Sequence, residues 1–210
     1  MLMTLSIIFM EKYQFVLASN SPYRKMLLEK MRLSFVTKAH QVNESEYRDG
    51  DPQCLAEQLA YEKAQSIMHM YPQSIIIGSD QMAYVEEDNR LLTKPRTMDN
   101  AIEQLLYLSG KTVIFYTGIA ILGSYHNISQ KTCDTFSVTY KVLSKDTIIE
   151  YLNIEKPLNC LGCFKSEGLG IALLDNLTGR DPNALIGLPI LSLIDLLKKE
   201  NIDFFDCIEK

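Results

Sequence analysis

Hydrophobic and polar residues follow two different periods along this chain. Short apolar runs bounded by Gly, Pro, Asn or Asp predict buried strands, and apolar residues that recur every three or four positions predict amphipathic helices. The predicted strands cover residues 15–18, 33–38, 74–78, 82–86, 91–93, 111–122, 135–143 and 168–174. The predicted helices cover residues 23–31, 51–71, 97–108, 144–154 and 188–200.

The order of these elements places the chain in the α/β class. Strands alternate with helices, but the neighbouring strands 82–86 and 91–93 form a predicted hairpin, which argues against a purely parallel sheet. We therefore expect a mixed, twisted sheet flanked by helices. No repeat, low-complexity tract or linker divides residues 15–205, which we expect to form one domain. Residues 1–14 are predicted to be an N-terminal extension, either disordered or, with Met10 as the start, not translated.

Composition narrows the functional class. Hydrophobic residues make up 47% and charged residues 22% of the 210 residues, which is typical of a globular protein with its own core. The formal net charge of −5 argues against nucleic acid as a partner. No apolar window is long enough to predict a membrane span. Five cysteines, an odd number, favour reduced thiols and a cytoplasmic location.

The first candidate site lies where the first strand passes into the first helix. Ser21 suits the N-cap and Pro22 the first helical position, so free backbone N–H groups face the loop. With the hydroxyl of Ser19 and the guanidinium of Arg24, they form a plausible phosphate-binding set. The alternative, that Ser21 only caps the helix and Arg24 points into water, stays open.

The second candidate site centres on Asp80. It follows a run of three isoleucines, so we expect it just past the carboxyl end of a buried strand, where open α/β sheets bind ligands. Glu44, in a polar loop, could join it as a metal ligand. Lys63 falls on the apolar side of the long helix, where a lysine costs energy unless its ammonium reaches solvent, the commoner outcome, or contacts an anion. The alternatives are a turn-forming aspartate, a solvated glutamate and a lysine whose ammonium reaches solvent.

Other polar residues carry weaker signals. Lys94, Lys165 and Arg180 each lie in a loop or turn. Whether they belong to a site depends on whether they come together in the folded chain. Cys160 and Cys163 have the spacing of a zinc knuckle, but the chain offers no second pair. Two packed thiols are therefore the better interpretation.

Taken in order, these residues resemble the motifs of the Maf family. The matching segments are Leu17-Ala18-Ser19-Asn20-Ser21-Pro22-Tyr23-Arg24, Glu62-Lys63-Ala64, Gly78-Ser79-Asp80-Gln81, Lys94-Pro95 and Tyr116-Thr117-Gly118. Two later segments resemble the 7-methyl-GTP pyrophosphatase branch of that family: Gly162-Cys163-Phe164-Lys165-Ser166-Glu167-Gly168 and Gly179-Arg180-Asp181-Pro182-Asn183. The dTTP/UTP branch has Gln-Gly in place of the Lys-Ser-Glu-Gly loop and usually Thr at the position of Gln81.

The resemblance implies a two-lobed α/β fold with a cleft between the lobes. It also implies a divalent cation, Mg²⁺ or Mn²⁺, and hydrolysis of a nucleoside triphosphate between its α- and β-phosphates. Such an activity keeps modified nucleotides out of nucleic acids, and the family has a link to cell-division arrest. A homodimer is compatible with the resemblance. Two alternatives remain: a dTTP/UTP pyrophosphatase, and a non-catalytic nucleotide-binding regulator of cell division.

The resemblance also implies roles for individual residues. Asp80 matches the proton acceptor, and the residues themselves leave open that it is a metal ligand instead. Glu44 would share the cation with Asp80, although Asn43 stands where the family often has a second carboxylate. The remaining matches concern the substrate: Tyr23, Gln81 and Glu167 for its choice, and Ser19, Arg24, Lys63 and Lys94 for its phosphates, with Lys165 and Arg180 as further candidates.

A physical argument supports two of these assignments. Methylation at N7 makes guanine cationic, so the aromatic face of Tyr23 would attract it by roughly 0.5–2 kcal/mol. The carboxylate of Glu167 can accept two guanine N–H bonds while balancing the positive ring. The alternative is that Tyr23 packs on its own helix and Glu167 caps a turn.

Overall fold

The computed structural model describes residues 13–44, 47 and 50–208. Residues 1–12 of the predicted N-terminal extension lie outside them. The strands are β1 (Phe15–Leu17), β2 (Phe35–Thr37), β3 (Ile75–Val85), β4 (Arg90–Leu91), β5 (Thr112–Gly123), β6 (Ile128–Tyr140) and β7 (Leu174–Gly179). The α-helices are α1 (Pro22–Lys30), α2 (Pro52–Met68), α3 (Met98–Leu108), α4 (Lys145–Glu155), α5 (Asn183–Ile186) and α6 (Ile190–Lys199).

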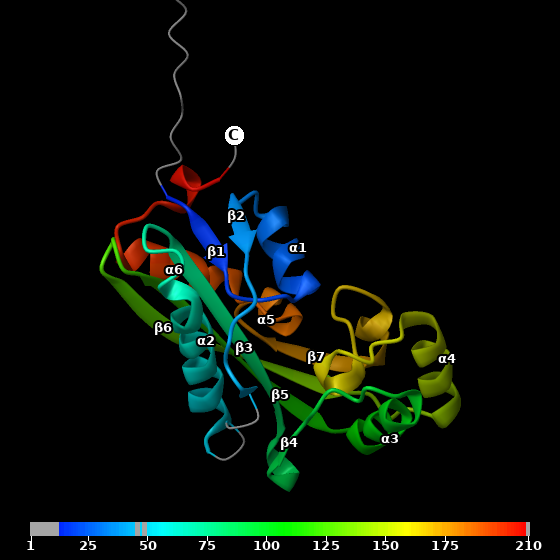
Figure 1. Cartoon of the computed structure of the whole chain (residues 1–210). Coiled ribbons are helices and arrows are strands. Elements are labelled where there is room, and N and C mark those ends of the chain that lie inside the picture. The colour runs from blue at the N-terminus through cyan, green and yellow to red at the C-terminus, as the bar shows by residue number, and fades with distance from the viewer. Residues whose placement is uncertain (1–12, 45–46, 48–49, 209–210) are drawn as a thin grey trace, which may run out of the picture.

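All seven strands belong to one mixed sheet (Figure 1). Its order is β2-β1-β3-β5-β6-β7, and β4 pairs with the far end of β3. The pairs β1–β2 and β1–β3 are parallel, and all the others are antiparallel. The predicted mixed sheet flanked by helices is therefore confirmed.

Four of the helices begin at residues whose side chains cap them. Ser21, Asp51, Thr97 and Ser144 each accept a hydrogen bond from the backbone N–H three residues further on. Such caps satisfy a donor that the first helical turn leaves free. The caps predicted at Ser21 and Ser144 are confirmed.

The sheet separates α2 from the other helices. Along β3, Ile75 and Ile77 belong to a core cluster with residues of α1 and α6, whereas Ile76 packs with residues of α2. Further along the same strand, Ala83 and Val85 belong to a second cluster with α3 and α4. Because side chains alternate along a strand, α1, α3, α4 and α6 share one face and α2 covers the other.

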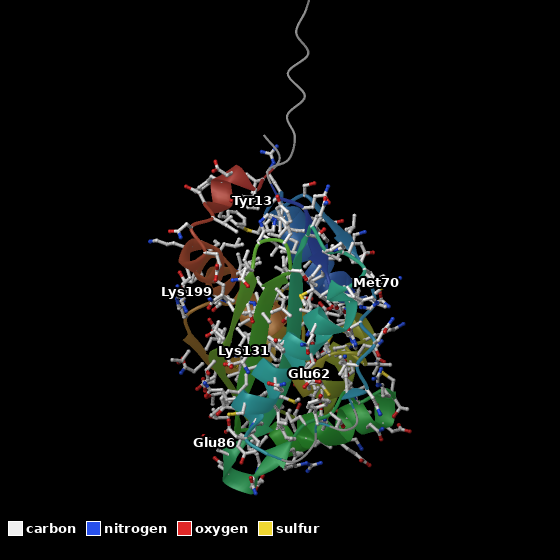
Figure 2. All side chains as sticks on the ribbon, turned by 60° about the vertical axis from the view of Figure 1, so that its left-hand side comes forward. Tyr13, Glu62, Met70, Glu86, Lys131 and Lys199 are labelled. Carbon is white, nitrogen blue, oxygen red and sulfur yellow. The ribbon has the colours of Figure 1, made fainter. Side chains whose placement is uncertain are left out.

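Two glycines allow α2 to lie unusually close to the sheet. A Cβ at Gly78 of β3 would lie 2.0 Å from the carbonyl oxygen of Ala60, and one at Gly118 of β5 would lie 2.1 Å from that of Ala56. Only glycine permits such an approach of backbone to backbone. Figure 2 shows α2 across this face, where Lys131 of β6 forms an ion pair with Glu57 at 3.4 Å.

The edge of β3 opposite β5 has a gap in its strand pairing. It pairs with β1 over residues 75–77 and with β4 over residues 84–85. Between these pairings, the described strands pair with none of residues 78–83 on that edge, although the carbonyl oxygen of Ala83 accepts a hydrogen bond from the N–H of Leu92, just after β4. Asp80 and Gln81 lie in this gap, which is where the sheet opens into a cleft.

The sequence prediction for β3 was wrong in one respect. It placed a loop at Ser79, Asp80 and Gln81 between two strands, so Asp80 was expected past a strand end. The observed strand runs unbroken from Ile75 to Val85. Each of the three polar side chains has a hydrogen-bond partner from another element, which makes its burial within a strand tolerable.

The strand predicted at residues 168–174 was also wrong. Those residues form the 3₁₀ helix η4 (Leu169–Leu173), and the strand β7 follows it. β7 is an edge strand with mostly exposed residues, so its sequence lacks the apolar alternation of a half-buried strand. Its pairing with β6, which ranges from Phe136 to Tyr140, defines it instead.

The two ends of the described chain meet the same part of the fold. Gln14 accepts a backbone hydrogen bond from Ile75, and Leu33 forms an isolated antiparallel bridge with Ile208. Both ends of the described chain thus contact the rest of the fold through their backbone. Among the helices of the described residues, none has both the length and the apolar character needed to cross a bilayer.

Candidate active site

A cleft of about 560 Å³ opens where the sheet is split between β1 and β4. Its walls come from the start of α1, the inner side of α2, the middle of β3, the β4–α3 loop, the loop after α4 and the end of α5. The predicted site residues that line it are Tyr23, Arg24, Glu44, Lys63, Asp80, Gln81, Lys94 and Glu167.

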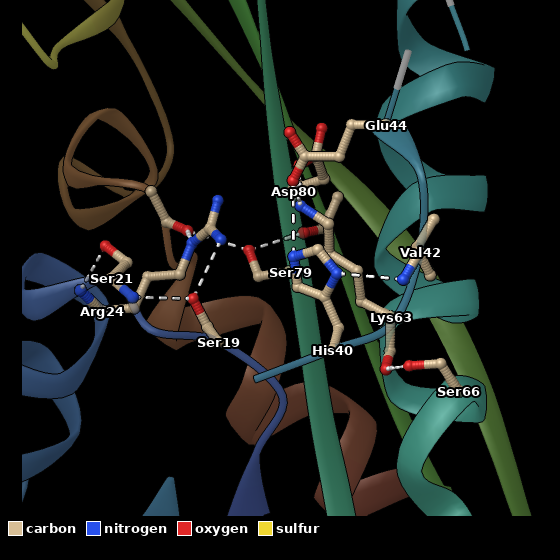
Figure 3. A network of polar contacts seen from close by, with 12 residues as sticks. Ser19, Ser21, Arg24, His40, Val42, Glu44, Lys63, Ser66, Ser79 and Asp80 are labelled. Carbon is tan, nitrogen blue, oxygen red and sulfur yellow. Dashed lines mark hydrogen bonds and ion pairs between the residues drawn. The ribbon is translucent and has the colours of Figure 1, made fainter. Parts of the chain in front are cut away.

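The centre of the cleft is a lysine between two carboxylates. Lys63 Nζ lies 2.5 Å from Asp80 Oδ1 and 2.5 Å from Glu44 Oε1 (Figure 3). Lys63 is 2% exposed, and its helix is held close to the sheet by the two glycines. Of the two alternatives for Lys63, an anionic partner is therefore the one observed.

The charges of this cluster are strongly coupled. A hydrogen bond with His40 and the ammonium of Lys63 hold the pKa of Glu44 well below its usual range. His40 Nε2 lies 3.4 Å from Glu44 Oε1, the same oxygen that contacts Lys63. The carboxylate of Glu44 is therefore ionised at any pH at which the protein is expected to work.

The second part of the site is the β1–α1 loop. Ser19 Oγ accepts hydrogen bonds from the backbone N–H of Ser21 at 3.1 Å and from Arg24 Nη1 at 3.4 Å. Arg24 Nε donates to the carbonyl oxygen of Gly187 at 2.7 Å, which fixes the guanidinium across the cleft from Lys63 (Figure 3). Arg24 therefore points into the cleft rather than into bulk water.

Positive charge accumulates here without an equal number of close anions. Burial lowers the pKa of Arg24, while the carboxylates of Asp80 and Glu44 act in the opposite direction. Partial burial and the charge of Arg24 lower the pKa of Lys94, which also lines the cleft. A polyanion placed between Arg24, Lys63 and Lys94 would relieve this mutual repulsion.

Gln81 is oriented by α5. Its Nε2 lies 2.7 Å from the carbonyl oxygen of Ala184, 3.2 Å from that of Leu185 and 3.2 Å from Thr117 Oγ1. Ser79 Oγ lies within hydrogen-bond distance of the Gly187 carbonyl oxygen, at 2.8 Å. Polar residues of β3 thus hold the end of α5 as one wall of the cleft.

The far end of the cleft combines an aromatic ring, a thiol and a carboxylate. Cys160 Sγ lies 3.8 Å from Tyr23 Oη. Burial, Cys160 and the charge of Glu167 raise the pKa of Tyr23 to about 12, so its hydroxyl stays protonated. Glu167 is exposed at this end of the cleft. Among the described residues, its carboxylate forms no ion pair, and the neighbouring Lys165 pairs with Glu155 instead.

Two weaker candidates lie outside the cleft lining. Lys165 Nζ contacts Glu155 Oε2 at 3.2 Å and the Glu155 carbonyl oxygen at 2.7 Å, so it fastens the loop that carries Glu167. Arg180 forms an ion pair with Asp195 at 2.7 Å, beside α6 and away from the cleft. Neither side chain converges with the other candidates.

The structure adds residues that the sequence did not single out. Arg96 and Asn159 line the cleft, and Arg96 Nη1 donates to Asn159 Oδ1 at 3.1 Å, joining two of its walls. Gly187 contributes only its backbone, so no side-chain motif identifies it. The Asp181-Pro182-Asn183 segment is a helix-start signal that could have revealed α5, since Asp181 accepts from the N–H of Asn183 at 2.9 Å.

The described residues contain no group of three or more His, Cys, Asp or Glu side chains that could hold a metal ion. Two hard oxygen donors are nevertheless present in Asp80 and Glu44. Their contacts with Lys63 and His40 use Oδ1 and Oε1, one oxygen of each carboxylate. The donor chemistry therefore fits a cation such as Mg²⁺ that completes its shell with water and phosphate oxygens.

A mixed sheet, split at a carboxylate–lysine cluster that faces a partly buried arginine, defines an α/β protein with a charged cleft. The chain belongs to the Maf family: the model described as "Maf-like protein" matches residues 14–200. The family predicted from the sequence is confirmed.

Individual relatives match most of the chain. A protein of Colwellia psychrerythraea named 7-methyl-GTP pyrophosphatase is 47% identical over 188 residues, or 90% of this chain and 93% of the relative. One of the same name from Vibrio cholerae is 44% identical, over 92% and 99% of the two chains. The Ham1 protein of Staphylococcus aureus has a weaker structural likeness, with a TM-score of 0.42 and 16% identity over 61% of this chain and 71% of its own.

Proposed function

We propose that this protein hydrolyses 7-methyl-GTP between its α- and β-phosphates, releasing pyrophosphate and 7-methyl-GMP. The observation that carries the proposal is that Lys63 contacts both Asp80 and Glu44 in the same cleft that Arg24 lines. The names of relatives that are 43–47% identical over about 90% of the chain support the choice of substrate.

The cleft offers a different chemical environment at each end. We place the triphosphate between Arg24, Lys63 and Lys94, with Ser19 as a further donor. The base would then lie toward Tyr23 and Glu167. A volume of about 560 Å³ is within the range of sites for ligands of nucleotide size.

The proposed reaction also uses a divalent cation. Asp80 and Glu44 are the residues that would hold Mg²⁺ or Mn²⁺. When bound, such an ion acidifies water and neutralises charge on phosphate oxygens. The protein's own cations would share the second task, because in the proposed placement of the triphosphate Arg24 and Lys94 contact the phosphates that leave as pyrophosphate.

The reaction is a displacement at the α-phosphorus. A water oxygen forms the new bond to this phosphorus, the bond to the bridging oxygen breaks, and pyrophosphate leaves with the bonding electrons. The water's proton passes toward Asp80 or to solvent. Lys63 holds Asp80 Oδ1 in place at 2.5 Å, which fixes the direction of the carboxylate.

Asp80 has two roles open to it, as proton acceptor and as cation ligand. Asp80→Asn separates them when Mn²⁺ binding and turnover are both measured. Loss of Mn²⁺ affinity by tenfold or more identifies a ligand. Retained affinity with turnover reduced by about 10²–10⁴-fold identifies the proton acceptor.

Selectivity for the methylated base follows from charge. The ring of 7-methylguanine is cationic, so it would gain from the face of Tyr23 and from the carboxylate of Glu167. The high pKa of Tyr23 keeps its hydroxyl neutral beside these groups. Glu167→Gln should therefore lower kcat/KM for 7-methyl-GTP more than for GTP.

The deciding experiment measures pyrophosphate release from 7-methyl-GTP, GTP, dTTP and UTP with Mg²⁺ or Mn²⁺, beside Asp80→Asn. Highest turnover with 7-methyl-GTP, lost in Asp80→Asn, supports the proposal. Highest turnover with dTTP or UTP keeps the reaction but contradicts the assigned base end. Nucleotide binding without any pyrophosphate release would instead support a non-catalytic regulator.

A further inference from the structure

A histidine outside the quoted motifs contacts the carboxylate that we assign to the cation. His40 lies in the segment between β2 and α2, and its Nε2 is 3.4 Å from Glu44 Oε1. On the other side of the ring, the backbone N–H of Val42 donates to Nδ1 at 3.3 Å (Figure 3). Both ring nitrogens therefore have a partner.

This pattern fixes which nitrogen carries the proton. Because Nδ1 accepts a hydrogen bond, the neutral imidazole carries its proton on Nε2, the atom that faces Glu44. The side chain of His40 is 22% exposed, whereas that of Glu44 is 56% exposed. The orientation of the Glu44 side chain is therefore set by its polar contacts more than by packing.

The segment that carries His40 is fastened to the same turn of α2 as Lys63. The backbone N–H of Gln41 donates to Ser66 Oγ at 3.1 Å, and Ser66 Oγ donates to the carbonyl oxygen of Lys63 at 2.8 Å. At the start of the segment, the N–H of Lys38 donates to the carbonyl oxygen of Leu17 at 3.0 Å. The segment that carries His40 is therefore anchored both to the turn of α2 that carries Lys63 and to the end of β1.

We propose that His40 is a positioning residue that holds Glu44 in the orientation in which it binds the divalent cation; this inference rests on the proposed function. His40 and Lys63 both contact Oε1, so they direct the carboxylate from two sides and leave Oε2 for the ion. Without His40, Lys63 would be the one side chain in the described part of the chain that restrains the carboxylate of this exposed glutamate. Residues that orient a metal ligand in this way typically affect metal affinity by about 10–100-fold.

The test measures Mn²⁺ binding to the full chain by the loss of the free-ion EPR signal, without nucleotide. His40→Ala and His40→Phe should weaken Mn²⁺ affinity by about tenfold. His40→Gln should restore it to within about threefold of the wild type, because its amide can donate to Glu44. His69→Ala is the matched control, since His69 is exposed at the end of α2 and should bind Mn²⁺ normally.

The activity assay separates positioning from a general structural effect. In His40→Ala, the Mn²⁺ concentration that gives half-maximal turnover should rise about tenfold, with kcat at saturating Mn²⁺ close to the wild-type value. If His40→Ala does not fold by far-UV circular dichroism, His40→Phe decides, because it keeps the ring and removes the donor.

Three results would overturn the inference. They are unchanged Mn²⁺ affinity in His40→Ala or His40→Phe, a His40→Gln variant as weak as the alanine variant, and a wild-type protein that binds no Mn²⁺. Failure of the proposed function has a different signature: the wild type would then bind Mn²⁺ in a His40-dependent way but release no pyrophosphate.

Discussion

The ammonium of Lys63 is buried between two carboxylates. Its two contacts at 2.5 Å compensate for its removal from water, and Asp80, 8% exposed, depends on it in return. Removing one partner of a buried pair is costly because the other charge is left without compensation. The same residue thus serves stability and the site.

We expect Lys63→Met to lower the free energy of unfolding by about 3 kcal/mol and turnover by about 10²–10³-fold. Urea denaturation and pyrophosphate release measure the two effects. Lys131→Met is the matched control: it removes a partly exposed ion pair with Glu57 and should cost less than about 1 kcal/mol. Equal losses of stability in the two variants would contradict the account of Lys63.

A second buried carboxylate, Asp134 of β6, forms no ion pair within the described part of the chain. Ser192 Oγ donates to its Oδ2 at 3.1 Å, but among the described residues no group hydrogen-bonds to Oδ1. Burial raises the pKa of Asp134 above its usual 3.8. A raised pKa in the folded state means that this carboxylate reduces stability as the pH rises through that value.

Asp134→Asn should therefore gain stability relative to the wild type as the pH rises to 7, by about 1 kcal/mol, because its amide does not ionise in this buried position. The gain should shrink as the pH falls toward 3.8, where the wild-type carboxyl is increasingly protonated. Urea denaturation at pH 7 and pH 4.5 measures it. A similar gain in Asp175→Asn, at an exposed position of β7, would refute this explanation.

At the scale of elements, the distance between α2 and the sheet determines the site. Lys63 reaches Asp80 because Gly78 and Gly118 let the helix backbone approach the strands. Gly118 is paired in register with Asp80 itself, so a shift of α2 at this point acts directly on the lysine–carboxylate contact.

Gly118→Ala should lower the free energy of unfolding by about 1–3 kcal/mol or more, because its Cβ would lie 2.1 Å from the carbonyl oxygen of Ala56. We also expect turnover to fall by about 10-fold or more, since Lys63 moves with the helix. Gly123→Ala is the control, as its Cβ meets no atom closer than 3.4 Å. Stable Gly118→Ala protein with full turnover would contradict the role given to this contact.

At the scale of the whole molecule, long strands join the two main core clusters. On β5, Ile119 and Ile121 belong to the cluster with α1 and α6, while Val113 and Phe115 belong to the cluster with α3 and α4. β3 contributes to both clusters in the same way. If the shared strands unfold in one cluster, apolar residues of the other cluster become exposed as well.

We therefore expect one cooperative unfolding transition. Far-UV circular dichroism, which follows secondary structure, and tyrosine fluorescence, which follows packing, should give coincident curves in urea. Two separated transitions, or curves that do not coincide, would show that the two core clusters unfold independently.

Local physics explains which parts of the fold were predictable. The N-caps at Ser21 and Ser144 use groups that are adjacent in sequence, and the isoleucine run of β3 needs only its own apolarity to predict burial. By contrast, the polar middle of β3 and the exposed strand β7 carry no local signal. Their strand conformation depends on partners from α2, α5 and β6.

The sequence by itself determined the class, the family and the residues to consider, because motifs and periodicity are properties of neighbouring positions. Only the tertiary structure decided which of those residues meet. It brought Lys63 to Asp80 and Glu44, left Arg180 beside α6, and added His40 to the cluster. These outcomes depend on helix-to-sheet distance and on which strands pair, quantities set by contacts between residues far apart in the chain.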